Sequence, residues 1–342
     1  MTDKYTTPSF ADYFIEQRKQ SNIFLDKINQ FIDWKHIDKL LKKKYKKTFS
    51  ADGRPAYPPL PMFKLLLLER WYGLSDPGLE EALNDRISFI RFSGFSLTSS
   101  LPDHSTICRF RNTLLELGLY EKLFEEIMKQ LESKGLLVKE SNGAIVDATI
   151  VESSRRPRKV MEIMPEDRKE EKTETSPAVA TYSDDTDASW IKKGKRPYYG
   201  YKAHISVDAK DGYVLGGHVT PANVADTTEF EKLIDTAMLP EGSMVLADKG
   251  YTSEKNRTIL AEKKLINGIM DKAARNKPLT TTQITFNKLI SSVRYKVERT
   301  IGTLKRGYHF SRMRYTGLKK GNMELLLNAT AFNLKKAVAM VE

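Results

Sequence analysis

The spacing of the apolar residues changes once along this chain, close to residue 140. From residue 10 to residue 135 apolar side chains recur every three or four positions, which is typical of helices that bury one face. Beyond that point come short β-branched runs, beginning with GAIVDATIVESS at 143–154. The chain must therefore build a helical part first and a sheet-containing part second.

The second part predicts a mixed sheet with helices on its faces. The dipeptide Asp211-Gly212 lies inside the alternating segment 198–220 and predicts a hairpin, so part of the sheet is antiparallel. The segments that follow alternate strand and helix, and such crossovers require parallel pairing. Further strands are expected at 243–251 and 266–270, and helices at 226–238, 254–264, 283–306 and 322–340.

We expect three regions along the chain. Residues 1–50 form a helical segment with a role in dimerisation, residues 51–138 form a second helical domain, and residues 139–342 form an α/β domain. Within the last region, the stretch at about 153–190 is charged, contains proline and has no stable apolar period. We interpret that stretch as a largely disordered surface insertion.

The net charge of the chain indicates what kind of partner it binds. The chain carries a net charge of +12 with a pI of about 9.4, which favours a polyanion, nucleic acid ahead of an anionic membrane. The alternative is a solvated basic surface. The single cysteine, Cys108, allows no internal disulfide, and no Cys/His spacing suggests zinc. Because the N-terminus lacks a signal-peptide pattern and Leu65–Leu68 is too short to span a bilayer, we expect a cytoplasmic protein without membrane association.

Three carboxylates occupy positions that suggest chemistry. Asp147 interrupts an apolar strand, where a carboxylate is costly unless it is paired or binds a metal. Asp248 ends the strand MVLAD, and ligands of α/β sheets gather at the carboxyl ends of strands. Glu298 lies in the long basic helix. Each has a structural alternative: a buried cation could pair with Asp147, Asp248 could be a turn residue, and Arg294 could pair with Glu298.

The long helix points Glu298 toward a cleft. Val293, Val297, Ile301 and Leu304 form an apolar stripe that should face the sheet. Arg294, Glu298 and Lys305 are spaced by four and seven residues, so they fall on one line at the edge of that stripe. The carboxylate would then hold a metal while the surrounding cations hold phosphates.

Three carboxylates suit a site for two Mg²⁺ ions, with Mn²⁺ as a substitute. Magnesium prefers hard oxygen ligands and is often completed by phosphate oxygens of the substrate. A pair of such ions can promote in-line displacement at phosphorus. Lys202 and His204 share one face of the strand YGYKAHISV and could border the same cleft, although a structural histidine is an equally good interpretation.

At this point the sequence resembles a known family. The order Asp147, Asp248, Glu298 and the segments GYKAH, ADKGY and VRYKVERTIGTLKR are similar to bacterial insertion-sequence DDE transposases of the group named after insertion sequence five. That group carries the pattern Y-x2-R-x3-E-x6-K, on which Arg294, Glu298 and Lys305 match. Ser291 stands at the tyrosine position, which is a departure from the pattern.

The resemblance implies an RNase H-like catalytic domain that cleaves DNA and transfers strands. Asp147 would be shared by both ions, while Asp248 and Glu298 would each help to hold one. Arg294 and Lys305 would steady Glu298 and contact phosphate, with Lys249 and Arg306 as further phosphate contacts. The implied partners are the double-stranded DNA of the transposon ends and of the target. The protein would bind them as a homodimer or higher oligomer, in the nucleoid of a bacterial cytoplasm.

DNA recognition is expected in the helical domain at 51–138, while the resemblance implies catalysis in the domain at 139–342. Arg109 and Arg111 lie near the start of a helix in DHSTICRFRN, and with the helix at 77–92 they suggest a helix-turn-helix, although the connection at 93–102 is long for one. Packing is the alternative. The run KKKYKK at 42–47 is a candidate for nonspecific phosphate contact. The aromatic stripe of the segment 10–41 serves either a core or an interface and comprises Phe14, Phe24, Phe31 and Trp34.

Two alternatives to a transposase remain open at this point. One is a DNA-binding protein or repressor without catalysis, against which the presence of all three carboxylates argues. The other is a nuclease of the same fold that hydrolyses DNA and never joins strands.

Overall fold

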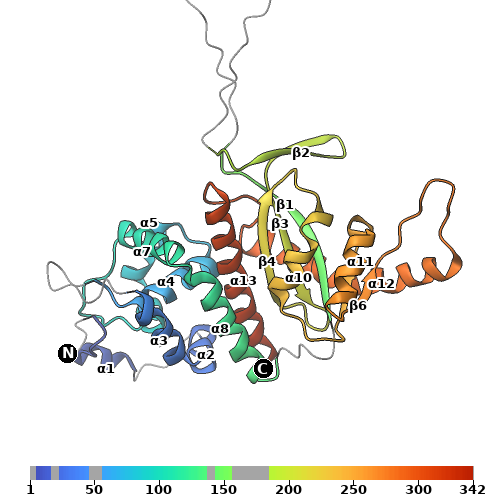
Figure 1. Ribbon diagram of the computed structural model, residues 1–342. Helices are drawn as coiled ribbons and strands as arrows, with labels where there is room; N and C mark the ends of the chain where they lie inside the picture. The colour runs from blue at the N-terminus through green and yellow to red at the C-terminus, as the bar shows by residue number, and fades with distance from the viewer. Residues whose placement is uncertain (1–4, 17–22, 46–55, 137–142, 156–184, 342) are drawn as a thin grey trace, which may run out of the picture.

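A helical half and a sheet-containing half lie side by side in the structure (Figure 1). The structure is a computed structural model, and it describes residues 5–16, 23–45, 56–136, 143–155 and 185–341. Residues 46 and 47 of the basic run KKKYKK, and most of the insertion predicted at 153–190, lie outside the described residues. The division near residue 140 is confirmed, since the first strand begins at Ala144.

The helical half is built around one buried helix. The helices of this half are α1 (Phe10–Glu16), α2 (Ile23–Phe31), α3 (Trp34–Lys44), α4 (Pro59–Tyr72), α5 (Asp76–Asp85), α6 (Ile87–Ser93), α7 (His104–Glu116) and α8 (Leu119–Ser133). Helix α4 is buried on nearly every face because α3, α5, α6 and α7 surround it. Pro59 opens α4, and Gly73, with φ of 63°, ends it in the left-handed conformation.

One predicted helix is divided in two. The helix expected at 77–92 breaks at Arg86 into α5 and α6. Gly118, whose φ is 58°, separates α7 from α8. Asp103 caps α7 through the Thr106 amide, and Ser75 caps α5 because its hydroxyl reaches the Gly78 amide.

The aromatic stripe at the N-terminus belongs to the core. The Phe24 ring packs edge-on against Trp71 at 5.1 Å between centroids, and Trp34 packs against Phe92 at 6.1 Å. Helices α2 and α3 therefore pack into the helical half, which agrees with the core alternative for these aromatic residues. A role of residues 1–50 in dimerisation stays a prediction. The Phe14 side chain lies outside the described part of the structure.

The sheet is mixed, as predicted. The strands are β1 (Ala144–Glu152), β2 (Ser189–Lys193), β3 (Arg196–Asp208), β4 (Val214–Pro221), β5 (Met244–Ala247) and β6 (Ile266–Ile269). Strands β4, β3 and β1 are antiparallel neighbours, while β1, β5 and β6 are parallel neighbours. This order, β4-β3-β1-β5-β6, is that of the RNase H-like sheet which the resemblance implied. Strand β2 pairs with the first residues of β3, so the predicted insertion ends before Ser189.

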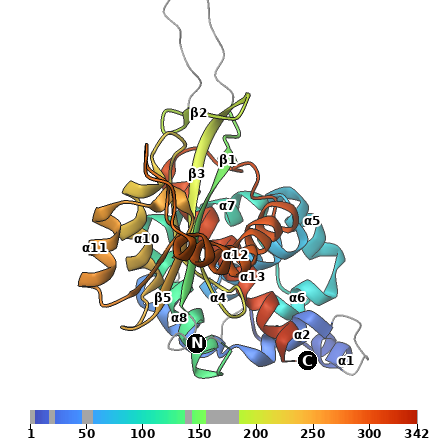
Figure 2. The ribbon, with the colours of Figure 1, turned by 90° about the vertical axis from the view of Figure 1, so that its right-hand side faces the viewer.

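Helices cover both faces of the sheet (Figure 2). The helical elements of this half are η2 (Asp226–Thr228), α10 (Phe230–Ala237), η3 (Lys249–Tyr251), α11 (Glu254–Glu262), α12 (Thr281–Gly307) and α13 (Leu318–Met340). Side chains of α10 and α11 share a core with Val146, Val245 and Ala247. Since side chains alternate along a strand, Asp147 and Leu246 face the other way, toward α12.

Helix α13 joins the two halves. It packs on β4 and on α2, α4, α7 and α8, and most of its residues are buried, including the polar residues Glu324, Asn328 and Asn333. Asn333 bonds both backbone groups of Val214, at 2.9 and 2.8 Å, and Asn322 accepts the Val219 amide at 2.9 Å. Helix α13 thereby satisfies the free edge of β4 with side-chain amides.

A buried ionic network fixes the same junction. Glu69 of α4 is fully buried and accepts hydrogen bonds from Arg111 of α7, at 2.7 Å, and from Arg314, which precedes α13. Glu324 of α13 accepts the Arg314 amide at 3.0 Å and pairs with Arg70. Because burying an unpaired charge costs several kcal/mol, each member holds its partners in place.

No helix in the described part of the chain is both long enough and apolar enough to cross a membrane.

Replacement of Glu69 by Gln should destabilise the folded protein strongly. The change leaves three guanidinium groups without their shared buried carboxylate, a loss on the order of 3–5 kcal/mol. The matched control is Glu80→Gln, which breaks an exposed contact with His104. Urea unfolding curves should show a large drop in midpoint for the first variant and little change for the second. Equal midpoints would contradict the role of the network.

Candidate active site

Asp147 lies in the middle of β1, half-buried, and faces α12. Its Oδ1 accepts the Ala148 amide at 2.8 Å, and its Oδ2 accepts Arg294 Nη2 at 3.1 Å. The ion pair joins side chains that are 15% and 20% exposed. The Arg294 guanidinium thus offsets the cost of burying Asp147. Pairing with a cation was one of the two explanations expected for a carboxylate in an apolar strand, the other being metal binding.

Asp248 lies beside Asp147 on the neighbouring parallel strand. The printed register pairs Ala144 with Val245 and Ile145 with Leu246, and continuing it by two residues brings Asp147 level with Asp248. Adjacent strands are about 4.8 Å apart, so the two carboxylates share one face at short range.

Asp248 also forms the turn that follows its strand. Its Oδ1 accepts the Gly250 amide at 2.7 Å and caps η3. A Cβ on Gly250 would lie 2.8 Å from that oxygen, so glycine lets the carboxylate approach the backbone. The turn fixes one oxygen of Asp248.

Glu298 reaches the same face from α12. Val297 and Leu304 are buried against the sheet, as the apolar stripe predicted, while Glu298 itself is exposed. Arg294 lies one turn earlier on the helix, but its ion pair is with Asp147 across the cleft. The interpretation of Glu298 as the partner of Arg294 is therefore wrong.

The three carboxylates interact electrostatically. Burial raises the pKa of Asp147, and the negative charges of Asp248 and Glu298 raise this pKa further. The Arg294 guanidinium and the Ala148 amide oppose the rise. Three segments that are far apart in the sequence thus meet at Asp147.

These residues fit a divalent cation by donor chemistry, because all three supply hard carboxylate oxygens. Among the described residues, however, no three His, Cys, Asp or Glu side chains are grouped so that they could hold one ion together. A site for two ions that share Asp147 requires only two carboxylate pairs, Asp147 with Asp248 and Asp147 with Glu298.

The predicted phosphate contacts Lys305, Lys249 and Arg306 differ in burial. Lys305 Nζ donates to the Ile150 carbonyl of β1 at 2.8 Å, and burial together with the nearby Lys193 charge lowers the Lys305 pKa. Lys249 and Arg306 are exposed. Lys249 also borders a groove of about 540 Å³ beside the first half of α12, whose lining includes Ser291, the residue at the tyrosine position.

Lys202 and His204 do not border this cleft. The register pairs Lys202 with Ile150 and His204 with Ala148, so both lie on the face of the sheet opposite Asp147. Lys202 is buried and bonds Asp226 at 2.8 Å. The alternating pattern placed the two residues on one face correctly, but it could not identify which face.

His204 is a structural residue. It is fully buried, contacts the Thr220 hydroxyl at 3.0 Å and stacks on His218 with ring centroids 5.0 Å apart. Burial lowers its pKa to about 3, so the ring is neutral in the folded protein. The prediction of His204 as a DNA contact is therefore wrong.

The two arginines predicted to contact DNA from α7 differ in position. Arg111 is 1% exposed and pairs with Glu69 and Asp76, so the core uses its charge and the prediction of a DNA contact is wrong. Arg109 is exposed, and its guanidinium donates to the Ser105 and Thr106 hydroxyls of its own helix. Arg109 remains a candidate for DNA contact.

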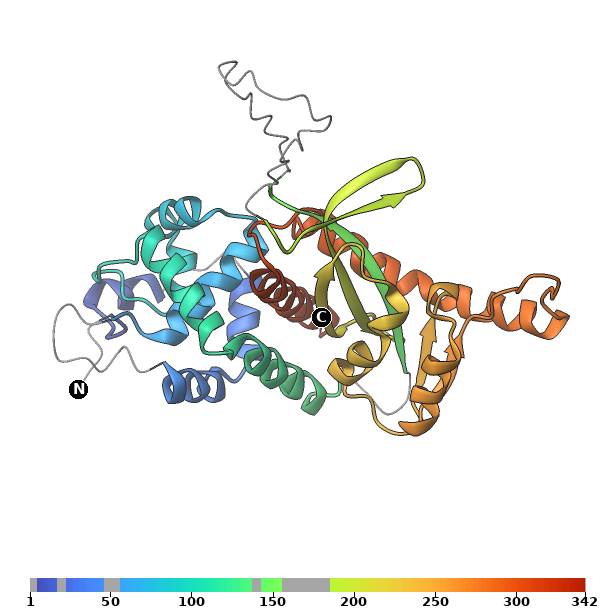
Figure 3. The same cartoon turned by 45° about the horizontal axis from the view of Figure 1, so that its top comes forward.

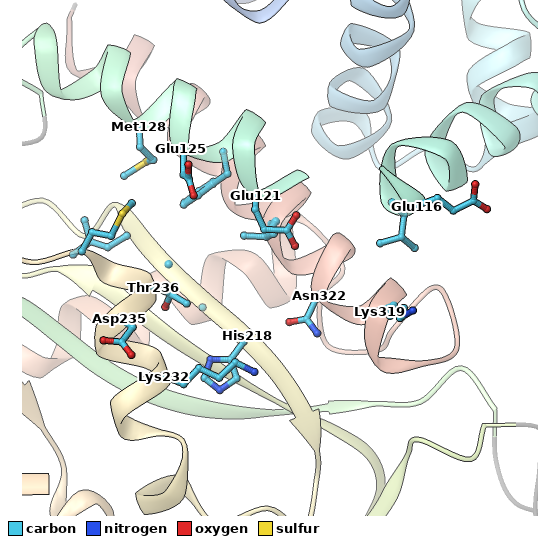
Figure 4. A pocket seen from close by; sticks show the side chains of 17 residues that line it. Glu116, Glu121, Glu125, Met128, His218, Lys232, Asp235, Thr236, Lys319 and Asn322 are labelled. Carbon is cyan, nitrogen blue, oxygen red and sulfur yellow. The ribbon is translucent and has the colours of Figure 1, made fainter. Parts of the chain in front are cut away.

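A cavity elsewhere is unsuited to this chemistry. It has a volume of about 640 Å³ and lies between α8, β4, α10 and α13 (Figure 4). None of the three carboxylates discussed above lines it. Glu116, Glu121 and Glu125 stand at its wall and would repel a DNA phosphate.

Comparison with known proteins identifies the family. Residues 13–113 match the family described as "Transposase domain (DUF772)", and residues 139–334, more than half of the chain, match "Transposase DDE domain". The transposase for insertion sequence element IS1106 of Neisseria meningitidis serogroup B is 41% identical over 230 residues, which cover 67% of this chain and 76% of that protein. The chain belongs to the DDE transposase family. Membership implies catalysis that depends on a divalent metal ion.

The narrower resemblance, to the group named after insertion sequence five, stays a prediction. The boundary proposed at residues 50 and 51 also stays untested, although the first family match runs across it.

Solved transposase structures show only remote similarity. A piggyBac transposase synaptic complex with hairpin DNA has a TM-score of 0.43 and 11% identity, covering 93% of this chain and 74% of that one. A Mos1 transposase paired-end complex has a TM-score of 0.22 and 12% identity, covering 98% and 93%.

Protonation of His204 should make folding stability depend on pH. The folded pKa of about 3 lies below the ordinary value of 6.5, so the unfolded chain binds the extra proton between these values. Stability from this residue is complete above pH 6.5 and is lost as the pH falls toward 3, with a slope of at most about 1.4 kcal/mol per pH unit.

Chemical denaturation between pH 7 and pH 4 can test this effect. His204→Gln should flatten the pH dependence relative to the wild type, whereas His36→Gln, at a position 70% exposed, should leave it unchanged. Parallel curves for the wild type and His204→Gln would show that the buried ring is not the titrating group.

Proposed function

We propose that this DDE transposase cleaves DNA phosphodiesters at the ends of an insertion sequence and joins the freed 3′ hydroxyl to target DNA. The observation that carries the proposal is the convergence of Asp147, Asp248 and Glu298 from two parallel strands and one helix. Family membership supplies the reaction class, and the convergence supplies the residues.

Magnesium is the proposed cofactor, as two ions, with Mn²⁺ as a substitute. Asp147 would be shared between the ions, with Asp248 completing one carboxylate pair and Glu298 the other. When bound, such ions lower the pKa of an attacking water or hydroxyl and offset charge on the leaving oxygen. The hard oxygen donors of these side chains match the preference of magnesium.

The protein side chains divide the remaining work. Arg294 holds Asp147 in one orientation through Oδ2, and the Ala148 amide holds Oδ1. The turn at Gly250 fixes Asp248 in the same way. Lys249 and Arg306 are exposed beside the cleft and would bind backbone phosphates on either side of the scissile bond. Lys305 is hydrogen-bonded to the Ile150 carbonyl of β1 and would add positive charge near the site.

Double-stranded DNA is the proposed partner, at both the element's ends and the target. The net charge of +12 supplies a sequence-independent attraction to phosphate. Sequence recognition would come from the helical half, with Arg109 of α7 as the exposed candidate. Because two ends must be joined to one target, the active form would be a homodimer or a higher oligomer.

Amide substitutions test the catalytic assignment. Asp147→Asn, Asp248→Asn and Glu298→Gln should each reduce cleavage of a duplex carrying the terminal inverted repeat by at least about a hundredfold, because each removes a carboxylate that would hold a metal ion. Asp235→Asn is the matched control, since Asp235 is exposed on α10 and pairs with Lys263. Strand nicking is measured on a denaturing gel with Mg²⁺. Wild-type rates in any of the three variants would refute its role.

Strand joining separates a transposase from a nuclease. Supplied with a pre-cut end that carries a free 3′ hydroxyl, the wild-type protein should join that end to plasmid DNA, and Asp147→Asn should not. Nicking without joined product would favour a hydrolytic nuclease. Binding of the DNA with neither reaction would favour a repressor.

A further inference from the structure

A two-stranded ribbon extends beyond the sheet above α12 (Figures 1 and 3). Strand β1 ends where Glu152 pairs with Gly200, but β3 continues outward beyond that point, paired with β2 from Ser189–Gly200 to Lys193–Arg196. Gly194, with φ of 62°, makes the tight turn at the tip. Residues 189–199 therefore form an arm that only its base attaches to the sheet.

The arm is strongly basic. Residues 189–199 contain four basic side chains, Lys192, Lys193, Lys195 and Arg196, and no acidic one. All four are exposed. Arg196 lies 4.9 Å from the Tyr198 ring and meets Glu152 at 3.3 Å, but this pair is largely exposed and holds Arg196 only weakly.

Trp190 gives the arm an exposed aromatic surface. The side chain is 51% exposed, and its ring packs on Tyr199 with centroids 5.2 Å apart. Together with Tyr198, these rings border a hollow of about 380 Å³ at the base of the arm. Lysines on an edge strand can serve only to prevent aggregation, but that purpose would not leave a tryptophan half in water.

The arm lies on the catalytic side of the sheet. In the register of β1 and β3, Asp147 lies opposite Ile205, so their side chains share one face of the sheet. Every second residue of β3 points to that same face, which includes Tyr199 in the arm. Trp190 of β2 lies opposite Tyr199 and shares this face. Lys193 at the tip is close enough to Lys305 of α12 for its charge to lower the Lys305 pKa. The arm and the carboxylates thus face the same space.

We propose that residues 189–199 form a DNA-binding arm that grips the strand leading into the active site, with its basic side chains on phosphates and Trp190 stacked on a base. Two-stranded ribbons fit the grooves of DNA, and exposed aromatic rings stack on bases of any sequence. The inference rests on the proposed function, because it takes DNA to be the substrate of the neighbouring carboxylates.

Salt dependence tests the charged part of the arm. Full-length protein is titrated onto a labelled duplex of mixed sequence with a short single-stranded extension, at several salt concentrations. The triple variant Lys192→Gln, Lys193→Gln, Lys195→Gln should bind more weakly, with a slope of log affinity against log salt smaller by about 2–3, near 0.9 for each lost phosphate contact.

The matched control is the triple variant Lys122→Gln, Lys129→Gln, Lys255→Gln, which removes the same charge from exposed positions on α8 and α11. The control should leave the slope close to that of the wild type. Equal slopes for the two triple variants would overturn the charged part of the proposal, since the arm would then contribute only net charge.

Tryptophan fluorescence tests the stacking. DNA should quench a component of the wild-type emission that is missing from Trp190→Phe, because Trp34 and Trp71 pack within the helical half. Trp190→Ala should weaken binding about tenfold or more, and Trp190→Phe less, as expected for loss and retention of a stacking ring. Identical quenching in the wild type and Trp190→Phe would overturn this part.

The outcomes distinguish the arm from the proposed function. Nicking that is lost in Asp147→Asn, together with unchanged binding in the arm variants, would reject the arm and keep the catalytic assignment. Wild-type nicking in Asp147→Asn would reject the catalytic assignment, whatever the arm variants show. Thermal unfolding of each variant confirms that the fold is intact.

Discussion

The ion pair between Asp147 and Arg294 is the contact on which this site depends. A carboxylate in the middle of an apolar strand is unfavourable, and the structure meets the cost with one guanidinium, at 3.1 Å, and one backbone amide, at 2.8 Å. The same contact fastens α12 to β1, so it sets where Glu298 lies. Arg294 therefore both stabilises the Asp147 carboxylate and helps to position Glu298 on the same helix.

The junction between the two halves provides a rigid base for that alignment. Helix α13 covers the edge of β4, while Glu69 gathers arginines from the helical half and from the segment that precedes α13. The chain after α12 also pairs with β1, since the Met313 amide donates to the Glu152 carbonyl at 2.8 Å. The strand that carries Asp147 is thus connected directly to the helical half, and DNA held by that half would have a fixed relation to the cleft.

Patterns local in sequence predicted much of this structure. The change of periodicity, the Asp211-Gly212 hairpin and the mixed sheet all follow from spacing and turn chemistry, and Asp147 was visible because a carboxylate in an apolar run needs a reason. The failures concern contacts between distant residues. Arg294 pairs with Asp147 instead of its helix neighbour Glu298, and Arg111 is neutralised by Glu69, 42 positions away. Neither partner can be inferred from local spacing.

Two further differences between the prediction and the structure have other causes, and the first is strand register. Alternation placed Lys202 and His204 together, but only the pairing of β3 with β1 shows that they face away from Asp147. The arm at 189–199 was not predicted for a different reason: its charged residues follow directly on a charged insertion and were not separated from it. The exposed Trp190 side chain on a paired strand distinguishes the arm from the insertion. That exposure depends on the fold and cannot be inferred from composition.

The central claim is that residues 147, 248 and 298 together bind divalent cations. Its most direct test is anomalous diffraction from crystals of the protein grown with Mn²⁺. The account predicts manganese peaks at Asp147, one shared with Asp248 and one with Glu298, and loss of both peaks in Asp147→Asn. Manganese bound elsewhere, with no peak within ligand distance of Asp147, would contradict it.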